Sequence, residues 1–439
     1  MKFFDRVQEM ALLQQIRKQS ETTARLTVVT GRRRIGKTQL IRNTLADTPY
    51  IYLYVGRKTE KELCLSLQQS ISDTLGLRLL GDASRLEELL KVVFEESVTR
   101  PVTMFIDEFQ DLYRVNPSVF SSLAALWDEY EKKSRLNLLV CGSIHRLMKR
   151  IFNDHQEPLY GRRTNFLRLE PFRPSVLKEI LGAHHPQYQA EDLLALWTFT
   201  GGVARYVQQL MDDGAVTKEA MIAAIFCDGS SFIDEGLALL AQEFGSDYGS
   251  YFSILSAIAG GSTEHSQIKN AFGSEPGAFL ARLENEFGLI RRKVPAFAEP
   301  KSRNSHYELG DNFLRWWFRF IFKHQNLVEL GRHEELQALV RRDYEVFSGA
   351  ALESYFRWKF VENTRYTRME PWWDRKGENE IDLVCEDEFN SIIDFYEIKR
   401  DPRRIDLGRL RVKGEAFLTK HPALRQRKCS YHGLSMQDM

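Results

Sequence analysis

A glycine-rich segment at residues 31–38, GRRRIGKT, is the feature that most constrains the fold of this 439-residue chain. It matches the pattern G-x-x-x-x-G-K-T. Residues 26–30 (LTVVT) are apolar and β-branched, which predicts a buried strand, and residues 39–45 have a helical pattern. A strand, a glycine-rich loop and a helix in this order form a P-loop, in which backbone N–H groups and the helix N-terminus face a phosphate.

The residues of this loop have distinct predicted roles in binding ATP. Gly31 and Gly36 let the backbone wrap around phosphate. Lys37 would contact the β- and γ-phosphates, and Thr38 would ligate Mg²⁺. The other predicted nucleotide-binding residues of the segment are Arg34 and Gln39. The alternative is a glycine-rich turn with a solvated basic tip, and the agreement of motif and context favours the P-loop.

An apolar run at residues 102–106 (VTMFI) ends in two carboxylates, Asp107 and Glu108. This is the Walker B arrangement. Asp107 would hold Mg²⁺ through its water shell, and Glu108 would orient and deprotonate the attacking water. The alternative is an acidic pair on the surface at the end of a strand, but the position downstream of a P-loop favours the catalytic interpretation.

A further predicted strand, residues 136–141, is followed by Gly142 and Ser143. Ser143 could sense the γ-phosphate, or it could be the N-cap of a helix at residues 144–151. Arg162, Arg163 and Arg205 are candidates for an arginine that stabilises transition-state charge, although a surface ion pair is the simpler explanation for each.

Strand and helix patterns alternate in the first part of the chain and predict an α/β fold with a parallel sheet. Predicted strands are residues 26–30, 50–55, 102–106 and 136–141. Helical patterns follow residue 171, and then three helices and a hairpin in the pattern of a winged helix. The predicted domains are a P-loop ATPase domain (1–172), a helical lid (173–244), a winged helix (245–330) and a final α/β domain (331–439).

The chain resembles the prokaryotic AAA+/STAND-like P-loop ATPases that carry a winged helix and a C-terminal PD-(D/E)xK nuclease-like domain. The segments that carry the resemblance are FFDRVQEMALL, VVTGRRRIGKT, MFIDEFQDL, LLVCGSIHRLM, PLYGRRT, GGVARYV, LENEFGLIRRKVP and YELGDNFLRWWFRF. The resemblance implies that Phe4, Asp5 and Arg6 lie near the adenine. Ala204 stands where the family usually has proline, which weakens a sensor role for Arg205.

The last domain carries the D…E-x-K pattern of PD-(D/E)xK nucleases, formed by Asp382, Glu397 and Lys399. Alternation along a strand places Glu397 and Lys399 on one face. The two carboxylates, with Glu353 from a predicted helix, would hold a second Mg²⁺ or Mn²⁺, and Lys399 would position a water or stabilise the charge of the transition state. The alternative is a salt-bridged strand end at the surface, with Lys399 neutralising Glu397. The resemblance implies a nuclease-like fold here as well.

Basic residues dominate between Lys399 and Lys428, where only Asp401, Asp406 and Glu415 oppose them. This run could bind DNA phosphates beside the site, or it could be a solvated helix face at residues 407–418. Trp372 and Trp373 could stack on a base, although core packing is the simpler interpretation.

The charge balance, 61 Lys+Arg against 60 Asp+Glu, excludes a uniformly basic nucleic-acid-binding chain but allows a local patch. Five scattered cysteines and an N-terminus without an apolar run predict a reducing, cytoplasmic setting and no membrane insertion.

We therefore expect an ATP-hydrolysing protein with Mg²⁺ that acts on DNA, with a metal-dependent nuclease-like domain and association into homo-oligomers. Two alternatives are a nucleotide-dependent switch that binds DNA without cutting it and a scaffold ATPase whose winged helix contacts proteins. The winged helix itself could dock on duplex DNA or pack as a spacer.

Overall fold

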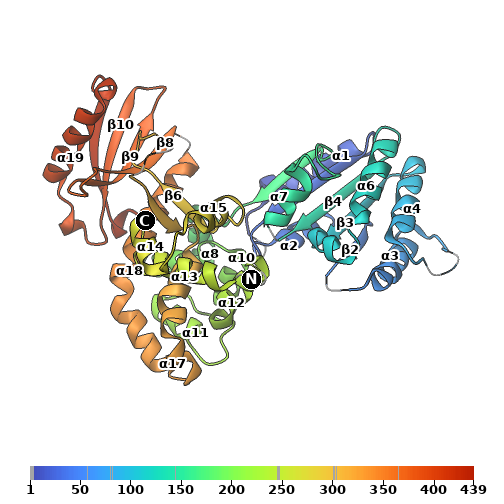
Figure 1. Cartoon of the computed structure of the whole chain (residues 1–439), viewed down its shortest axis with the longest axis horizontal. Helices are drawn as coiled ribbons and strands as arrows, with labels where there is room; N and C mark the ends of the chain where they lie inside the picture. The colour runs from blue at the N-terminus through green and yellow to red at the C-terminus, as the bar shows by residue number, and fades with distance from the viewer. Residues whose placement is uncertain are drawn as a thin grey trace. The chain divides into compact units, whose positions relative to one another are not determined.

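The computed structural model describes residues 4–439 except residues 57, 80, 82, 144, 245–247, 300–301, 303 and 364. The chain divides into two compact units: residues 5–170 form one, and residues 171–439 form the body of the other. The first unit contains a five-stranded sheet, and the second contains a two-stranded and a four-stranded sheet (Figure 1). The predicted domain boundaries at 172, 244 and 330 stay predictions, and residue 245, where the third predicted domain begins, lies outside the described residues.

The first unit is built on a five-stranded parallel sheet of order β2-β3-β4-β1-β5. Its strands are β1 (Arg25–Gly31), β2 (Ile51–Tyr54), β3 (Val102–Asp107), β4 (Leu136–Gly142) and β5 (Asn165–Leu169). The inner strands β3 and β4 are buried along their whole length, as expected for continuous apolar runs inside a parallel sheet. The predicted α/β class with a parallel sheet is confirmed.

Two groups of helices pack around this sheet. The helices α3 (Glu60–Leu75), α4 (Leu86–Thr99) and α6 (Ser118–Tyr130) share one hydrophobic core with the strands. The helices α1 (Val7–Ser20) and α2 (Lys37–Thr44) pack against each other and against β1. Shorter elements are η1 (Phe109–Asp111), α5 (Leu112–Val115) and α7 (His145–Asn153). The edge strand β5 is exposed at alternate residues, so its sequence, NFLRL, gives no apolar run that would predict it.

The second unit begins with helices and continues into a hairpin. The helices are α8 (Pro174–His184), α9 (Ala190–Thr200), α10 (Ala204–Asp212), α11 (Lys218–Ile225), α12 (Ser231–Phe244), α13 (Tyr248–Ala259), α14 (His265–Phe272) and α15 (Gly277–Asn285). The antiparallel hairpin is formed by β6 (Ile290–Lys293) and β7 (His306–Leu309). Residues 300, 301 and 303 of the polar loop that joins these strands lie outside the described residues.

An aromatic segment, FLRWWFRFIF, connects the hairpin to the last domain. It starts as α16 (Asn312–Trp316) and continues as a π-helical turn at Trp317–Ile321. The indole N–H of Trp316 donates to the carbonyl of Phe199, and that of Trp317 donates to the carbonyl of Ile233, both at 2.7 Å. The segment is thus a buried core helix. Among the described residues, no helix has the length and apolar character that a bilayer span requires.

The last domain is a four-stranded mixed sheet of order β11-β10-β9-β8. Its elements are η4 (Phe322–His324), α17 (Gln325–Glu329), α18 (His333–Asn363), β8 (Arg368–Trp373), β9 (Glu380–Asp387), β10 (Ile392–Ile398), η5 (Pro402–Arg404), α19 (Leu407–Lys420), η6 (Pro422–Leu424), β11 (Lys428–Leu434) and η7 (Met436–Asp438). Strands β8, β9 and β10 are antiparallel neighbours, and β11 adds in parallel to β10. The helix α19 packs on this sheet through Leu410 and Phe417.

We predict that Gly236→Ala destabilises the second unit. A Cβ atom at this buried position of α12 would lie 2.2 Å from the indole of Trp317. Overpacking of a core costs about 1–3 kcal/mol, which lowers the melting temperature by several degrees. The measurement is thermal unfolding followed by circular dichroism. Gly249→Ala is the matched control, because a Cβ atom there meets nothing within 4 Å. Equal melting temperatures for the two variants would contradict the packing described here.

Candidate functional site

The P-loop connects the end of β1 to the start of α2 and depends on two glycines. Gly31 has φ +150°, and a Cβ atom there would lie 2.7 Å from the carbonyl oxygen of Leu169. Gly36 precedes α2 with φ 95°, in the left-handed region that favours glycine. Arg34 also has a positive φ, 66°. The loop therefore has the tight, strained backbone that close wrapping around an anion requires.

The ammonium group of Lys37 lies within this loop. Its Nζ donates to the carbonyl oxygens of Gly31 at 3.0 Å and Arg32 at 3.1 Å. The side chain is buried, and this burial lowers its pKa, while Cys141, Glu108 and Asp107 act in the opposite direction. Lys37 is thus held at the loop, next to the carboxylates at the end of β3.

Asp107, at the end of β3, is a buried carboxylate with four donors. Its Oδ2 accepts from the hydroxyl of Thr38 at 2.9 Å and from the hydroxyl of Tyr52 at 3.3 Å. Its Oδ1 accepts from the thiol of Cys141 at 2.8 Å and from the N–H of Glu108 at 3.0 Å. The two predicted Mg²⁺ ligands, Thr38 and Asp107, are therefore in direct contact.

Two of these donors, Tyr52 and Cys141, were not predicted from the sequence. Burial, followed by the charge of Asp107, raises the pKa of Tyr52 to about 12. The same causes raise the pKa of the Cys141 thiol well above its ordinary value. Both groups therefore keep their protons near neutral pH and can donate to Asp107. Each residue lies in an apolar strand. Only the alternation of side chains along that strand could have indicated which face of the sheet the residue occupies.

Glu108 follows Asp107 with a left-handed backbone, φ 53°. Its Oε2 accepts from the hydroxyl of Ser143 at 2.8 Å and from the side-chain amide of Gln110 at 2.5 Å. Ser143 directly follows β4, the neighbour of β3 in the sheet. The predicted catalytic carboxylate and the predicted γ-phosphate sensor are therefore hydrogen bonded to each other, at the same edge of the sheet as the P-loop.

Two further residues that were predicted to bind the nucleotide, Arg6 and Gln39, differ in burial and in their contacts. Arg6 is buried, and it donates to the carbonyl of Glu170 at 2.7 Å, just beyond β5. Because β5 pairs with β1 up to Gly31, Arg6 lies at the P-loop edge of the sheet. Gln39 is exposed and donates to Asn43 within α2. The adenine contact of Arg6 stays a prediction.

The arginine candidates differ in their surroundings. Arg162 forms an ion pair with Asp128 at 2.6 Å, which agrees with the simpler interpretation. Arg163 donates to the side chain of Asn153 at 2.8 Å. Arg205 is exposed at the start of α10.

The pairing of β9 with β10 brings together the D…E-x-K residues of the C-terminal domain. The antiparallel register pairs Tyr396 with Leu383. Continued by one residue, this register places Glu397 opposite Asp382. Oδ2 of Asp382 accepts from Nζ of Lys399 at 2.9 Å and from the N–H of Ile398 at 2.7 Å. A salt bridge is therefore present at this strand end. It joins Lys399 to Asp382, whereas the prediction paired Lys399 with Glu397.

The other two carboxylates differ in their partners. Glu397 is buried and accepts at 2.7 Å from the N–H of Asp406, the N-cap residue of α19. Glu353 lies on α18, and no hydrogen-bond donor is found for its carboxylate within the described part of the chain. Burial, followed by the charge of Asp382, raises the pKa of Glu353 to about 7, while Lys293 and Lys399 act in the opposite direction.

Carboxylate oxygens are the hard ligands that Mg²⁺ and Mn²⁺ take, so the residue types fit a metal site. Across the residues that the structure describes, however, no three His, Cys, Asp or Glu side chains are arranged as a complete ligand group. Glu353 and Asp382 interact, but the carboxylates of Asp382 and Glu397 are both directed at protein donors. A metal at this site would have to compete with Lys399 and with the N-terminus of α19.

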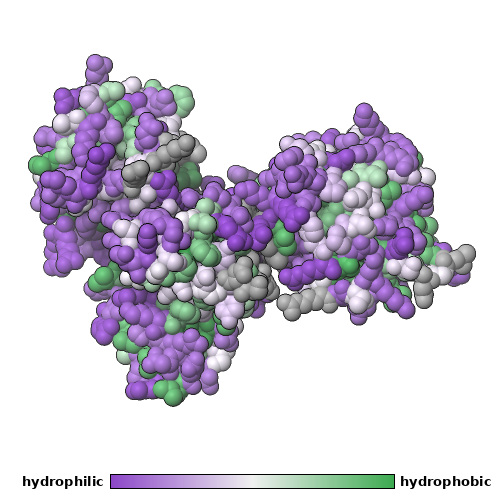
Figure 2. All heavy atoms as spheres, in the orientation of Figure 1, coloured by the Kyte–Doolittle hydropathy of each residue, from purple (hydrophilic) through white to green (hydrophobic). Residues whose placement is uncertain are grey.

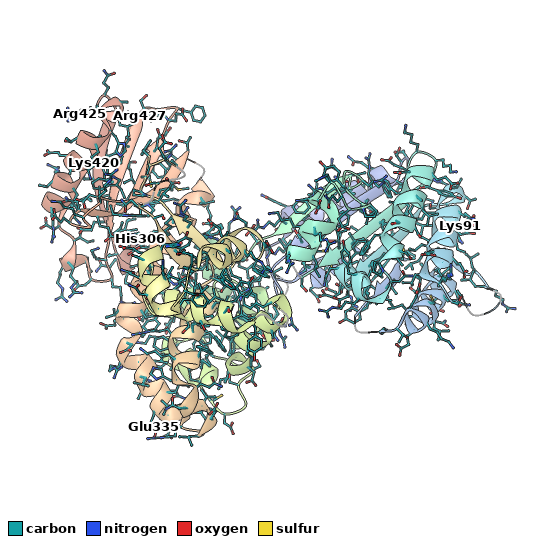
Figure 3. All side chains as sticks on the ribbon, in the orientation of Figure 1. Lys91, His306, Glu335, Lys420, Arg425 and Arg427 are labelled. Atoms are coloured by element: carbon teal, nitrogen blue, oxygen red, sulfur yellow. The ribbon has the colours of Figure 1, made fainter. Side chains whose placement is uncertain are left out.

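A basic surface, defined by Arg404, Arg409, Arg411, Lys420, Arg425 and Lys428, extends along α19 and the turn after it, and all six residues are exposed. Lys420 and Arg425 lie at the α19 side of the sheet together with Arg427, which pairs with Glu386 (Figure 3). Hydrophilic residues cover most of the face of this domain seen in Figure 2. Trp372 and Trp373 are buried in the sheet, so they pack in the core rather than stack on a base.

Two parts of the chain match known protein families. Residues 3–210 match an ATPase domain predominantly from Archaea, and residues 317–406 match a family of archaeal and bacterial proteins of unknown function. A relative described as an uncharacterized protein of Methanocaldococcus jannaschii is 27% identical over 413 residues, which cover 90% of this chain and 87% of that protein.

Two solved structures share the fold. A Walker-type ATPase of Pyrococcus abyssi is 20% identical, with a TM-score of 0.54 over 72% of this chain and 96% of its own. The ORC2 protein of Aeropyrum pernix, solved in ADPNP and ADP complexes, is 15% identical, with a TM-score of 0.50 over 74% of this chain and 95% of its own. The resemblance inferred from the sequence motifs, to Walker-type P-loop ATPases, is confirmed at the level of the fold.

We predict that Glu353→Gln stabilises the metal-free protein at pH 8 and leaves its stability at pH 4 unchanged. The pKa of Glu353 is raised to about 7 from 4.5. The folded state therefore favours the protonated form, whose stabilising effect is fully present below about pH 4.5 and is lost as the pH rises through about 7. The measurement is the melting temperature against pH in EDTA. Glu345→Gln, at an exposed position of the same helix, is the control. Parallel curves for wild type and Glu353→Gln would contradict this assignment.

Proposed function

We propose that this chain binds ATP with Mg²⁺ and hydrolyses it at the P-loop, because residues 3–210 match an ATPase domain predominantly from Archaea. The observation that carries the proposal is the contact between Thr38 and Asp107, at 2.9 Å, beside the loop that holds Lys37. These are the residue types and the placement that a triphosphate with its metal ion requires.

In this proposal each residue has one task. Lys37 binds the β- and γ-phosphates, and Thr38 and Asp107 hold Mg²⁺, which neutralises charge on the phosphates. Glu108 takes the proton of the attacking water. Its Oε2 is oriented by the hydroxyl of Ser143, which also lies where it could respond to the γ-phosphate. Four donors fix the orientation of Asp107, so its carboxylate needs little rearrangement when the metal binds.

We predict that Glu108→Gln retains ATP binding and lowers the rate of hydrolysis by about 10²–10⁴-fold, since the amide cannot accept the proton of water. Lys37→Ala should lose binding as well as hydrolysis. Binding is measured with a fluorescent ATP analogue, and hydrolysis is measured by release of inorganic phosphate. Gln39→Ala, on the exposed face of α2, tests the weakest member of the predicted set. Hydrolysis at the wild-type rate by Lys37→Ala would show that the P-loop is not the site of the reaction.

A second candidate function belongs to the C-terminal domain, which we propose to be a metal-dependent nuclease-like domain that acts on DNA. The observation that favours it is the juxtaposition of Asp382, Lys399 and Glu353 at the start of β9 and the end of β10. Mg²⁺ or Mn²⁺ bound by Glu353, Asp382 and Glu397 would supply Lewis acidity at a phosphodiester. Lys399 would release Asp382 and bind the negatively charged phosphate oxygens. The basic surface along α19 would bind the DNA backbone.

The alternative within this candidate is a nucleotide-dependent regulatory switch or scaffold that binds without cutting. The direction of Asp382 and Glu397 toward protein donors favours this alternative, and the intact D…E-x-K set favours cleavage. The proposal further includes a reducing, cytoplasmic setting, in which the five free cysteines stay as thiols. It also includes association of copies on ATP, which would let an arginine of one copy reach the γ-phosphate bound by another.

We predict that the wild-type protein nicks plasmid DNA with Mn²⁺ and that Asp382→Asn abolishes nicking, because the amide cannot replace the carboxylate as a metal ligand. The assay is agarose-gel electrophoresis of plasmid, with and without ATP. Asp401→Asn is the matched control, since its carboxylate pairs with Arg403 outside the cluster. Hydrolysis of ATP by Asp382→Asn at the wild-type rate would show that the first unit is intact. Absence of nicking in every protein, with ATP hydrolysis preserved, would establish the non-cutting switch.

A further inference from the structure

The loop between β6 and β7 packs into the core of the C-terminal domain. Ala296 is fully buried in the hydrophobic cluster that includes Trp372, Phe395 and Phe417. Its N–H donates to the carbonyl oxygen of Pro371 in β8 at 2.9 Å. This loop is the part of a winged helix that would be expected to extend freely and touch DNA. Here one of its residues completes the core of another domain.

The residue after Ala296 strengthens this anchor. Phe297 has φ 64°, a conformation that an aromatic residue rarely adopts, which shows that the surrounding packing holds it there. Its ring centroid lies 5.8 Å from those of Phe417 and His421 in and beside α19. The guanidinium of Arg368 lies 4.3 Å from the centre of the same ring. The start of the loop is therefore packed between β8 and α19.

The return end of the loop contacts β8 as well. The side-chain oxygen of Asn304 accepts from the indole N–H of Trp373 at 2.9 Å. The ring of His306, the first residue of β7, lies 4.7 Å from that of Trp373, at the place where the hairpin meets the C-terminal sheet (Figure 3). The loop thus enters and leaves beside the same strand, and the hairpin is attached to the C-terminal domain at both ends of its loop.

The helices before the hairpin lack the positive charge that a DNA-reading unit needs. Lys269 and Arg282 are the only lysine and arginine of α13, α14 and α15. Lys269 pairs with Glu275 at 3.1 Å, and Arg282 pairs with Glu286 at 3.4 Å. The exposed residues of α15, which would be the recognition helix, are Ala278, Ala281 and Asn285. Binding to DNA requires lysine or arginine that can neutralise phosphates, so this face is a poor fit.

The strand β6, with the sequence IRRK, is basic. Lys293 is the last residue of β6, and its Nζ binds Oε2 of Glu308 at 2.6 Å. Lys293 pairs with His306, which contacts Trp373. Trp373 in turn pairs with Glu380, two residues before Asp382 on β9. The charge of Lys293 accordingly acts on Glu353, where it offsets part of the effect of Asp382.

We propose that the β6–β7 hairpin is a structural part of the C-terminal domain and brings Lys293 to the carboxylate cluster, where it binds a phosphate of the DNA backbone. In this proposal the helices α13–α15 do not contact DNA. This rests on the second proposed function, DNA binding by the C-terminal domain. Lys293 then complements Lys399: one cation comes from the hairpin and one from β10. A phosphodiester between the two would also release Lys293 from Glu308, since a phosphate oxygen competes for the same ammonium group.

The test is binding of fluorescein-labelled duplex DNA to the full chain in EDTA, followed by fluorescence anisotropy at several salt concentrations. Lys293→Met should weaken binding about tenfold and reduce the slope of log K against log salt by about one, as expected for one lost phosphate contact. Lys293→Arg keeps the charge and should bind within about twofold of wild type. Lys269→Met, an exposed lysine of α14 in the same unit, is the matched control and should also bind like wild type.

A second variant tests the helices directly. Ala281→Glu adds a negative charge to the exposed face of α15, and the proposal expects no change in DNA affinity. A large loss of affinity in Ala281→Glu, or wild-type binding by Lys293→Met, would overturn the inference while DNA binding by the protein stands. No DNA binding by the wild type would remove the DNA part of the proposed function, and the role of Lys293 with it. Circular dichroism of each variant confirms that the fold is kept.

Discussion

The N-terminal unit is organised around one buried negative charge, the carboxylate of Asp107. A buried carboxylate is costly unless hydrogen bonds compensate it. Here the donors come from the start of α2, from β2, from β4 and from the backbone at Glu108. They converge only if β2 and β4 flank β3 in parallel and if the P-loop returns to the same edge of the sheet, which is the strand order observed. The position of Asp107 therefore connects the order of the strands to the geometry of the nucleotide site.

The carboxylates of the C-terminal domain are compensated in a different way. Asp382 receives a full positive charge from Lys399, and Glu397 receives the N–H of Asp406 at the start of α19. Among the residues that the structure describes, Glu353 has neither kind of partner, and its pKa is raised. Asp107 is thus held by neutral donors, which orient its carboxylate without cancelling its charge. Asp382 is already paired with Lys399, so the metal ion proposed for this site would have to displace Lys399 first.

The positions of the residues that lie at strand ends were predictable from the sequence. The glycines of the P-loop, the pair Asp107 and Glu108, and the E-x-K alternation each follow an apolar run, and strand ends of a parallel sheet meet at one edge. Tyr52 and Cys141 were not predictable, because an aromatic or a thiol inside an apolar run is normally a core residue. The strands β5, β8 and β11 were also unpredictable, since their burial depends on partners distant in the sequence.

The hairpin loop shows why a domain boundary drawn from the sequence differs from the boundary of a core. Its Pro, Lys, Arg and Asn residues predict an exposed turn, and a boundary at residue 330 would assign the loop to the preceding helices. Burial of Ala296 and Phe297 is a tertiary property that local composition does not encode. A C-terminal domain cut at residue 331 would leave Trp372 and Phe417 without these contacts. The structural unit that contains Asp382 therefore includes the hairpin, and with it Lys293.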